Sequence, residues 1–332
     1  MHSTTPGPAA TRSRWLALAW VIPVAMVLVV LAVIAAQWLR GLPDVQSFMR
    51  DYPGATELPA GAPVGLPAWL GWQHFLNTFF LLFVFRTAWQ LRQAKRPDAF
   101  WTRNNTGLIR TRNAPIRIGI PLWFHHTINA LWVLNGVVFI VLIFATGQWV
   151  RIVPLTWEII PNAVSVGIQY ASLDWPTDNG WVNYNALQVL SYFTTVFIAA
   201  PLAILTGIRI APGLAGMLRP LDRIVPLRQS KTVHFAVWIW FIGFTIVHVT
   251  LVFATGALRN LNHMYASRDE VSWVGAGIFA AAVVVMIVAW FALKPNVLAA
   301  IASKTGTVWR PPRGSADGAR SSNSPRRSNS PS

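Results

Sequence analysis

Two histidines within one long apolar run are the residues of greatest chemical interest in this chain. His234 and His248 lie between Thr232 and Gly256, a stretch long enough to cross a bilayer. On an α-helix, fourteen positions rise about 21 Å and return to within about 40° of the starting direction. Both imidazoles are therefore expected on one face of one helix, one near each end. Ionisable groups inside a membrane are costly, so this pair indicates a function.

The composition indicates an integral membrane protein. Of the 332 residues, 54% are hydrophobic and only 11% are charged. The formal net charge of +16 does not indicate nucleic-acid binding, because the basic residues lie between and beyond the apolar runs. There is no cysteine, which excludes disulfides, thiolate-bound iron–sulfur clusters, c-type haem attachment and a cysteine nucleophile in this chain.

Six apolar runs predict an all-α membrane protein with six transmembrane helices. The first is interpreted as a signal anchor, with a cleaved signal peptide as the alternative. The predicted spans are residues 15–39, 67–90, 120–146, 184–208, 232–256 and 271–293.

The connections between these runs alternate between rich and poor in lysine and arginine. The rich segments are residues 1–14, 91–119, 209–231 and 294–332, and the poor ones are residues 40–66, 147–183 and 257–270. By the positive-inside rule, both termini are predicted to be cytoplasmic. The basic, low-complexity segment 294–332 is expected to be a disordered tail. Arginine greatly outnumbers lysine, and alanine and valine are abundant, which indicates a GC-rich bacterium. The protein is accordingly expected in a bacterial inner membrane.

This topology places the histidines at two depths. His74, near the start of the second span, falls at the outer level with His248, and His126 falls at the inner level with His234. Two imidazoles at one level suit the axial ligation of a b-type haem iron. Spans two to five, residues 67–258, are therefore predicted to form a four-helix core with two haem b groups.

The inner partner of His234 is ambiguous, because His125 and His126 are adjacent. Asn129 lies on the side of the helix nearer His125, as does a second asparagine further along. However, Asn129 follows His126 by three positions, just as Asn77 follows His74. For this reason His126 is preferred, and His125 is the alternative.

Other polar residues near the spans have simpler interpretations. His263, between asparagines in a loop, is expected to be solvated. Arg86, Arg209 and Arg228 lie near span ends, where they could pair with haem propionates, but they are interpreted as ordinary inner-face charges.

The chain resembles the membrane cytochrome b subunits of bacterial respiratory oxidoreductases, namely those of nickel–iron hydrogenases and the gamma subunits of formate dehydrogenases. Three motifs carry the resemblance: the His234/His248 pair, the start His126-x-x-Asn129-Ala130, and Tyr184-Asn185-Ala186-x-Gln188 leading to Leu205-Thr206-Gly207. The resemblance covers roughly residues 68–258 and implies two b haems and electron transfer between a catalytic partner and the quinone pool. Thr127 stands where the family has tryptophan, and the first and last spans are additional.

No catalytic centre is recognised in the sequence, so a partner is expected to supply the substrate chemistry. The resemblance implies an extracytoplasmic molybdenum enzyme or hydrogenase. Its docking surface is predicted on the outer loop 147–183, which carries Trp149, Trp157, Trp175 and Trp181. The alternative function is a haem-free transporter or scaffold that uses the histidines for proton transfer or packing. Proton relays usually include acidic residues, and none of the six spans contains one.

Overall fold

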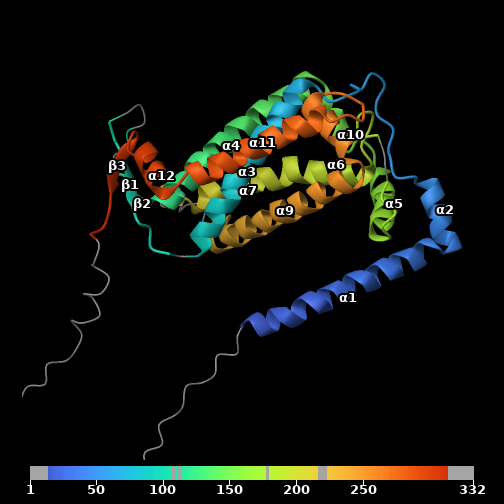
Figure 1. The fold of residues 1–332 in the computed structure, drawn as a ribbon, viewed down its shortest axis with the longest axis horizontal. Coiled ribbons are helices and arrows are strands. Elements are labelled where there is room, and N and C mark those ends of the chain that lie inside the picture. The colour runs from blue at the N-terminus through green and yellow to red at the C-terminus, as the bar shows by residue number, and fades with distance from the viewer. Residues whose placement is uncertain are drawn as a thin grey trace, which may run out of the picture. The chain divides into compact units, whose positions relative to one another are not determined.

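The structure is an all-α membrane protein, as predicted. This computed structural model describes residues 14–93, 95–106, 110, 114–176, 179–215 and 223–312. Within them, six helices are long and apolar enough to cross a membrane (Figure 1). They are Ala19–Arg40 within α1 (Arg14–Arg40), α3 (Ala68–Arg92), α4 (Ile120–Ala145), Ala186–Ile210, α9 (Leu227–Ala254) and α11 (Val274–Ala292).

The chain forms two compact units, which divide the predicted core 67–258 between them. The first comprises residues 1–64 and 148–193, and the second comprises residues 65–147 and 194–332. The helices of the first unit are α1, α2 (Pro43–Asp51), the 3-10 helix η1 (Gln148–Arg151), α5 (Ile159–Ala171) and α6 (Ala186–Phe193).

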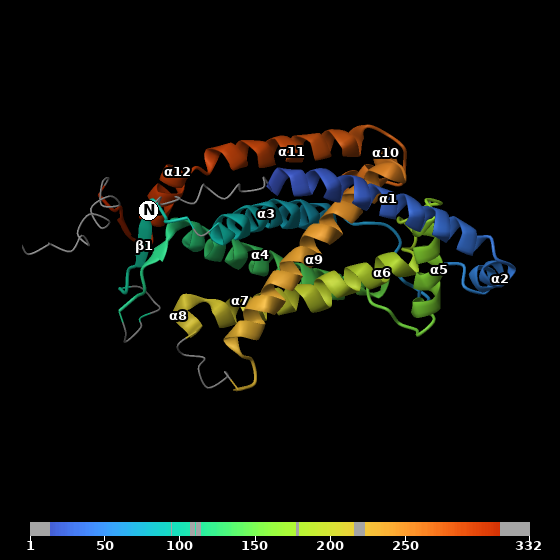
Figure 2. The same cartoon turned by 90° about the horizontal axis from the view of Figure 1, so that it is seen from below.

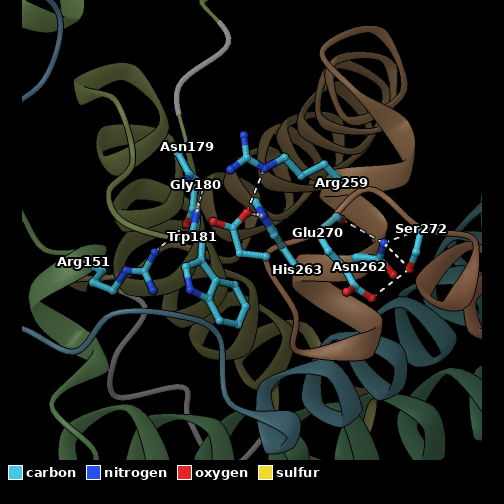
Figure 3. Close-up of polar contacts among 10 residues, drawn as sticks. Arg151, Asn179, Gly180, Trp181, Arg259, Asn262, His263, Glu270 and Ser272 are labelled. Atoms are coloured by element: carbon cyan, nitrogen blue, oxygen red, sulfur yellow. Dashed lines mark hydrogen bonds and ion pairs between the residues drawn. The ribbon is translucent and has the colours of Figure 1, made fainter.

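In the first unit, the two segments expected to be loops contain helices of their own. α5 packs against α1, α2 and α6, and an ion pair between Arg40 and Asp174 joins the end of α1 to the segment after α5. Arg151 is almost fully buried and donates from Nη2 to the Gly180 carbonyl at 2.6 Å (Figure 3). Its guanidinium also lies over the Tyr184 ring.

The motif Tyr184-Asn185-Ala186-x-Gln188 has a local structural role, since it begins the fourth span. The Gln188 N–H donates to Asn185 Oδ1 at 2.9 Å, and the Asn185 N–H donates to Gln188 Oε1 at 3.1 Å. These reciprocal bonds form a capping box, which satisfies two of the free N–H groups at a helix start.

The fourth span continues into the second unit through a π-helical turn. The π-helix η2 (Thr194–Ala199) connects α6 to α7 (Ala200–Ile210), and α8 (Pro212–Ala215) follows. Pro201 has no N–H and its ring excludes the carbonyl four residues earlier, so a regular α-helix cannot run through this point. Trp240 of α9 donates its indole N–H to Thr195 Oγ1 in this turn at 3.2 Å.

The second unit is built around the antiparallel pair α3 and α4 and the pair α7 and α9. Figure 2 shows α9 crossing toward α10 (Ala257–Leu261), and α11 running beside α3. An apolar cluster joins the four helices: buried Ala199, Val237 and Phe241, with Leu81 and Phe85 of α3 and Trp132 of α4 packed against them.

Beyond the end of α3 and the start of α4, the chain forms a small antiparallel sheet with strand order β2-β1-β3. The strands are β1 (Phe100–Arg103), β2 (Ile118–Gly119) and β3 (Gly306–Trp309), and Phe100 pairs with both Gly119 and Trp309. α12 (Pro295–Ala302) packs against α4 and β3.

This sheet corrects the prediction that the chain is disordered from residue 294 onward. Leu298, Ala299 and Ala302 are buried in one cluster with residues of α3 and α4. The apolar face of α12 is covered by packing against helices far away in the sequence, which the low-complexity end of the chain did not indicate. Residues 313–332 of the predicted tail lie outside the described residues.

Candidate functional site

The structure brings His74 and His248 together. His74 lies near the start of α3 and His248 near the end of α9, and their ring centroids are 6.1 Å apart at an interplanar angle of 72°. An imidazole that binds a metal ion at about 2 Å has its centroid about 3 Å from the ion, so two ligands on opposite sides place their centroids about 6 Å apart. The spacing of this outer pair therefore fits two axial ligands of one iron.

Aromatic rings line the outer pair. The Phe244 ring stacks on His248 with 5.5 Å between centroids and an interplanar angle of 7°. Tyr265 meets His74 edge-on at 5.8 Å, and Phe279 of α11 packs on the far side of Tyr265. Such a surrounding is apolar, as a porphyrin requires.

Tyr265 is held in place by the π-helix η4 (Asn262–Ala266), which follows α10. Asn262 is fully buried, and its Nδ2 donates to the carbonyls of Glu270 and Ser272 at 3.0 and 2.8 Å (Figure 3). Its Oδ1 accepts the Gly275 N–H at 2.7 Å, which fixes η4 to the start of α11.

The prediction that His263 is solvated is wrong. Its side chain is buried, and Nε2 lies 2.8 Å from Asp269 Oδ1, which also accepts a bond from Arg259 Nε at 2.8 Å. Figure 3 shows the side chains of Arg259 and His263 lying near each other. The sequence signal for this contact was an acidic residue, Asp269, six positions after His263. The loop conformation that brings the two side chains together is set by η4 and by Ser267, whose φ is 53°.

The inner histidines each meet a threonine hydroxyl on a neighbouring helix. His125 Nδ1 lies 2.8 Å from Thr87 Oγ1 of α3, and His234 Nδ1 lies 2.9 Å from Thr206 Oγ1 of α7. A Cβ at Gly207 would lie 3.4 Å from His234 Cε1, which shows how closely α7 and the His234 ring pack. We call His125 and His234, each of which meets a threonine hydroxyl, the inner pair.

His126 has a different environment. Its ring centroid lies 6.3 Å from that of His125, at an interplanar angle of 57°. Among the described residues it has no hydrogen-bond partner. Of these two adjacent histidines, His125, the alternative in the prediction, is the one whose ring nitrogen meets a hydroxyl on another helix.

The apolar cluster around Phe241 lies on α9 midway along the chain between His234 and His248. Trp132 of α4 meets Phe241 edge-on at 5.8 Å and donates its indole N–H to Asn77 Oδ1 at 2.8 Å. The two pairs are thus joined by close-packed side chains on α3, α4, α7 and α9.

The arginines near the span ends contact protein groups. Arg86 donates to the Trp290 and Leu293 carbonyls, both at 3.0 Å, and so caps the end of α11. Arg209 is buried and donates from Nε to the Val225 carbonyl at 3.1 Å. Arg228 is exposed.

Of the four tryptophans predicted to form a docking surface, Trp157 is the most open. Its side chain is 89% exposed, just before α5. Trp175 instead donates its indole N–H to the Tyr170 carbonyl at 3.2 Å, and Trp149 and Trp181 are half-buried.

Comparisons with protein-family models, with curated proteins and with solved structures give no match to this chain.

Proposed function

We propose that this protein is a membrane cytochrome b that binds two haem b groups and relays electrons between an oxidoreductase partner and the quinone pool. The observation that carries the proposal is the outer pair: His74 and His248, from helices far apart in the sequence, approach to 6.1 Å between ring centroids. A second histidine pair at the other end of α9 supports a second site.

The proposed iron ligands are His74 and His248 at the outer site and His125 and His234 at the inner site. We propose His125 in place of His126 because His125 hydrogen-bonds to Thr87. Histidines that bind metals commonly donate their other ring N–H to a fixed acceptor, as both inner histidines are positioned to do.

The haem irons, when bound, supply one-electron chemistry. The chain binds and orients them with side chains from α3, α4 and α9, and keeps water from the space between them with the cluster around Phe241. His234 and His248 are about 21 Å apart along α9, so the two sites span most of a bilayer about 30 Å thick.

We propose a bacterial inner membrane location with both termini cytoplasmic, based on the alternation of basic loops. The proposed partner is an extracytoplasmic oxidoreductase of the molybdenum or hydrogenase type. Trp157 and Leu155, which is 46% exposed, offer it an apolar contact in the outer loop.

The decisive measurement is a reduced-minus-oxidised spectrum of the purified protein, in which we expect a b-type α band. His248→Ala and His125→Ala are each expected to remove about half of the haem, from different sites, and the matched control His126→Ala to retain both. Absence of the band in the unsubstituted protein would favour the haem-free transporter or scaffold.

A further inference from the structure

The two threonines at the inner pair show the same arrangement, although they lie on different helices. Thr87 Oγ1 lies 2.8 Å from the Phe83 carbonyl oxygen of its own helix and 2.8 Å from His125 Nδ1. Thr206 Oγ1 lies 2.5 Å from the Leu202 carbonyl oxygen and 2.9 Å from His234 Nδ1.

This geometry determines where the protons are. A hydroxyl has one hydrogen, and a carbonyl oxygen can only accept. If the Thr87 hydroxyl donated to His125, its oxygen would face the Phe83 carbonyl oxygen at 2.8 Å with no hydrogen between them. The hydroxyl therefore donates to the carbonyl, and its lone pair accepts the hydrogen of Nδ1. The same reasoning applies to Thr206 and His234.

We propose that Thr87 and Thr206 are positioning residues that hold both inner imidazoles in the Nδ1–H tautomer. Nε2 of each ring is then the nitrogen with the free lone pair, and it is the nitrogen offered to a metal ion. The proposal deepens the function proposed above and rests on it for the identity of that metal as haem iron.

Burial makes this arrangement firm. Thr87 is fully buried and Thr206 is nearly so. Each hydroxyl also lies against a carbonyl oxygen on its own helix, so donating to the imidazole instead would leave the two oxygens 2.8 Å apart at Thr87 and 2.5 Å apart at Thr206 with no hydrogen between them. The acceptor is thus built into α3 and α7 before any ligand binds.

The expected consequence is chemical as well as geometric. A hydrogen bond from Nδ1–H makes Nε2 a stronger base, which favours the ferric over the ferrous iron. Loss of either threonine hydroxyl should raise the reduction potential of one haem and weaken its binding about tenfold.

The test uses Thr87→Val and Thr206→Val, which keep the shape and remove the hydroxyl, and Thr87→Ser and Thr206→Ser, which keep the hydroxyl. Thr127→Val is the control, because the Thr127 hydroxyl of α4 donates to the Trp123 carbonyl at 3.0 Å and contacts no histidine in the described residues. A potentiometric titration should show two transitions, one for each haem. Both valine variants should raise the midpoint potential of the same transition. The serine variants and the control should leave both midpoint potentials unchanged. Valine variants that shift different transitions, or none, would overturn the proposal.

A measurement without haem separates this proposal from the proposed function. In protein produced without haem and labelled with ¹⁵N-histidine, the nitrogen shifts of His125 and His234 should report the Nδ1–H tautomer. Thr87→Val and Thr206→Val should each abolish it for one ring. If the protein binds no haem, the cytochrome function fails, but these spectra still decide whether the threonines fix the tautomers.

Discussion

At the scale of single residues, hydrogen-bond partners decide between side chains that the sequence cannot separate. His125 and His126 are adjacent and both half-buried. Only His125 meets a hydroxyl, that of Thr87, thirty-eight positions earlier in the chain. The proposal that His125 is a ligand depends on that contact with another helix, which no local pattern around either histidine contains.

Asn262 is a second residue whose importance comes from buried hydrogen bonds. Replacing it by alanine leaves the Gly275 N–H and the Ser272 carbonyl without their partner. Each buried unsatisfied group costs about 1–3 kcal/mol, so Asn262→Ala should lower the free energy of unfolding by about 3 kcal/mol. Thermal unfolding of the purified protein measures this. Asn260→Ala, at a half-buried position, is the comparison and should cost about 1 kcal/mol; equal effects would contradict the expectation.

Tyr265 gives a pH dependence. Burial raises the pKa of the Tyr265 phenol to about 12, from an ordinary value of about 10. The folded protein then holds more protons than the unfolded protein between these values, so this contribution to stability is complete below about pH 10 and is lost as the pH rises through 12. Between about pH 9 and 12, the free energy of unfolding should decrease less in Tyr265→Phe than in the unsubstituted protein. Tyr52→Phe, in the other compact unit, is the control and should retain the full loss.

At the scale of elements, helix α9 is shared by both proposed haem sites. It supplies His234 and His248, and Val237 and Phe241 between them pack into the apolar cluster. Pro201 prevents a regular α-helix at the π-helix η2, and Thr195 of η2 accepts a hydrogen bond from the indole N–H of Trp240 on α9. The fourth span has no histidine, but its last helix, α7, supplies Thr206. An element without a ligand thus still shapes the inner site.

The contact between α11 and α10 depends on a glycine. A Cβ at Gly275 would lie 2.5 Å from the Asn262 backbone nitrogen, whereas a Cβ at Gly277 would meet nothing within 4 Å. Gly275→Ala should therefore lower the free energy of unfolding by about 1–3 kcal/mol, and Gly277→Ala on the same helix should change it by less than about 0.5 kcal/mol. Because η4 carries Tyr265, the spectrum of the outer haem should also change only in Gly275→Ala. The opposite order of effects would refute the close contact.

At the scale of the whole molecule, the alternation of basic loops makes a prediction about orientation. The chain has no cysteine, so single cysteines can be introduced without background. Thr156→Cys, in the loop predicted to be outside, should react with a membrane-impermeant maleimide in intact cells. Ser303→Cys, in the segment predicted to be inside, should react only after permeabilisation. Both positions are exposed in the structure, so burial cannot explain a lack of labelling.

The sequence by itself determined the features that depend on composition and spacing along the chain. Apolar length fixed six spans, since the bilayer requires about twenty apolar residues per helix. The fourteen-residue spacing placed His234 and His248 near the two ends of one helix, because helix geometry is regular. The level of His74 also followed from loop charge, and the structure places it beside His248.

Only the tertiary structure decided what depends on contacts between distant segments. It brought Thr87 and Thr206 to the inner histidines, buried His263 against Asp269, and folded residues 295–309 into α12 and β3. The residue type alone does not reveal whether a hydroxyl or a carboxylate faces lipid, water or an imidazole. Its partner is chosen by helix packing, and packing is a property of the whole chain.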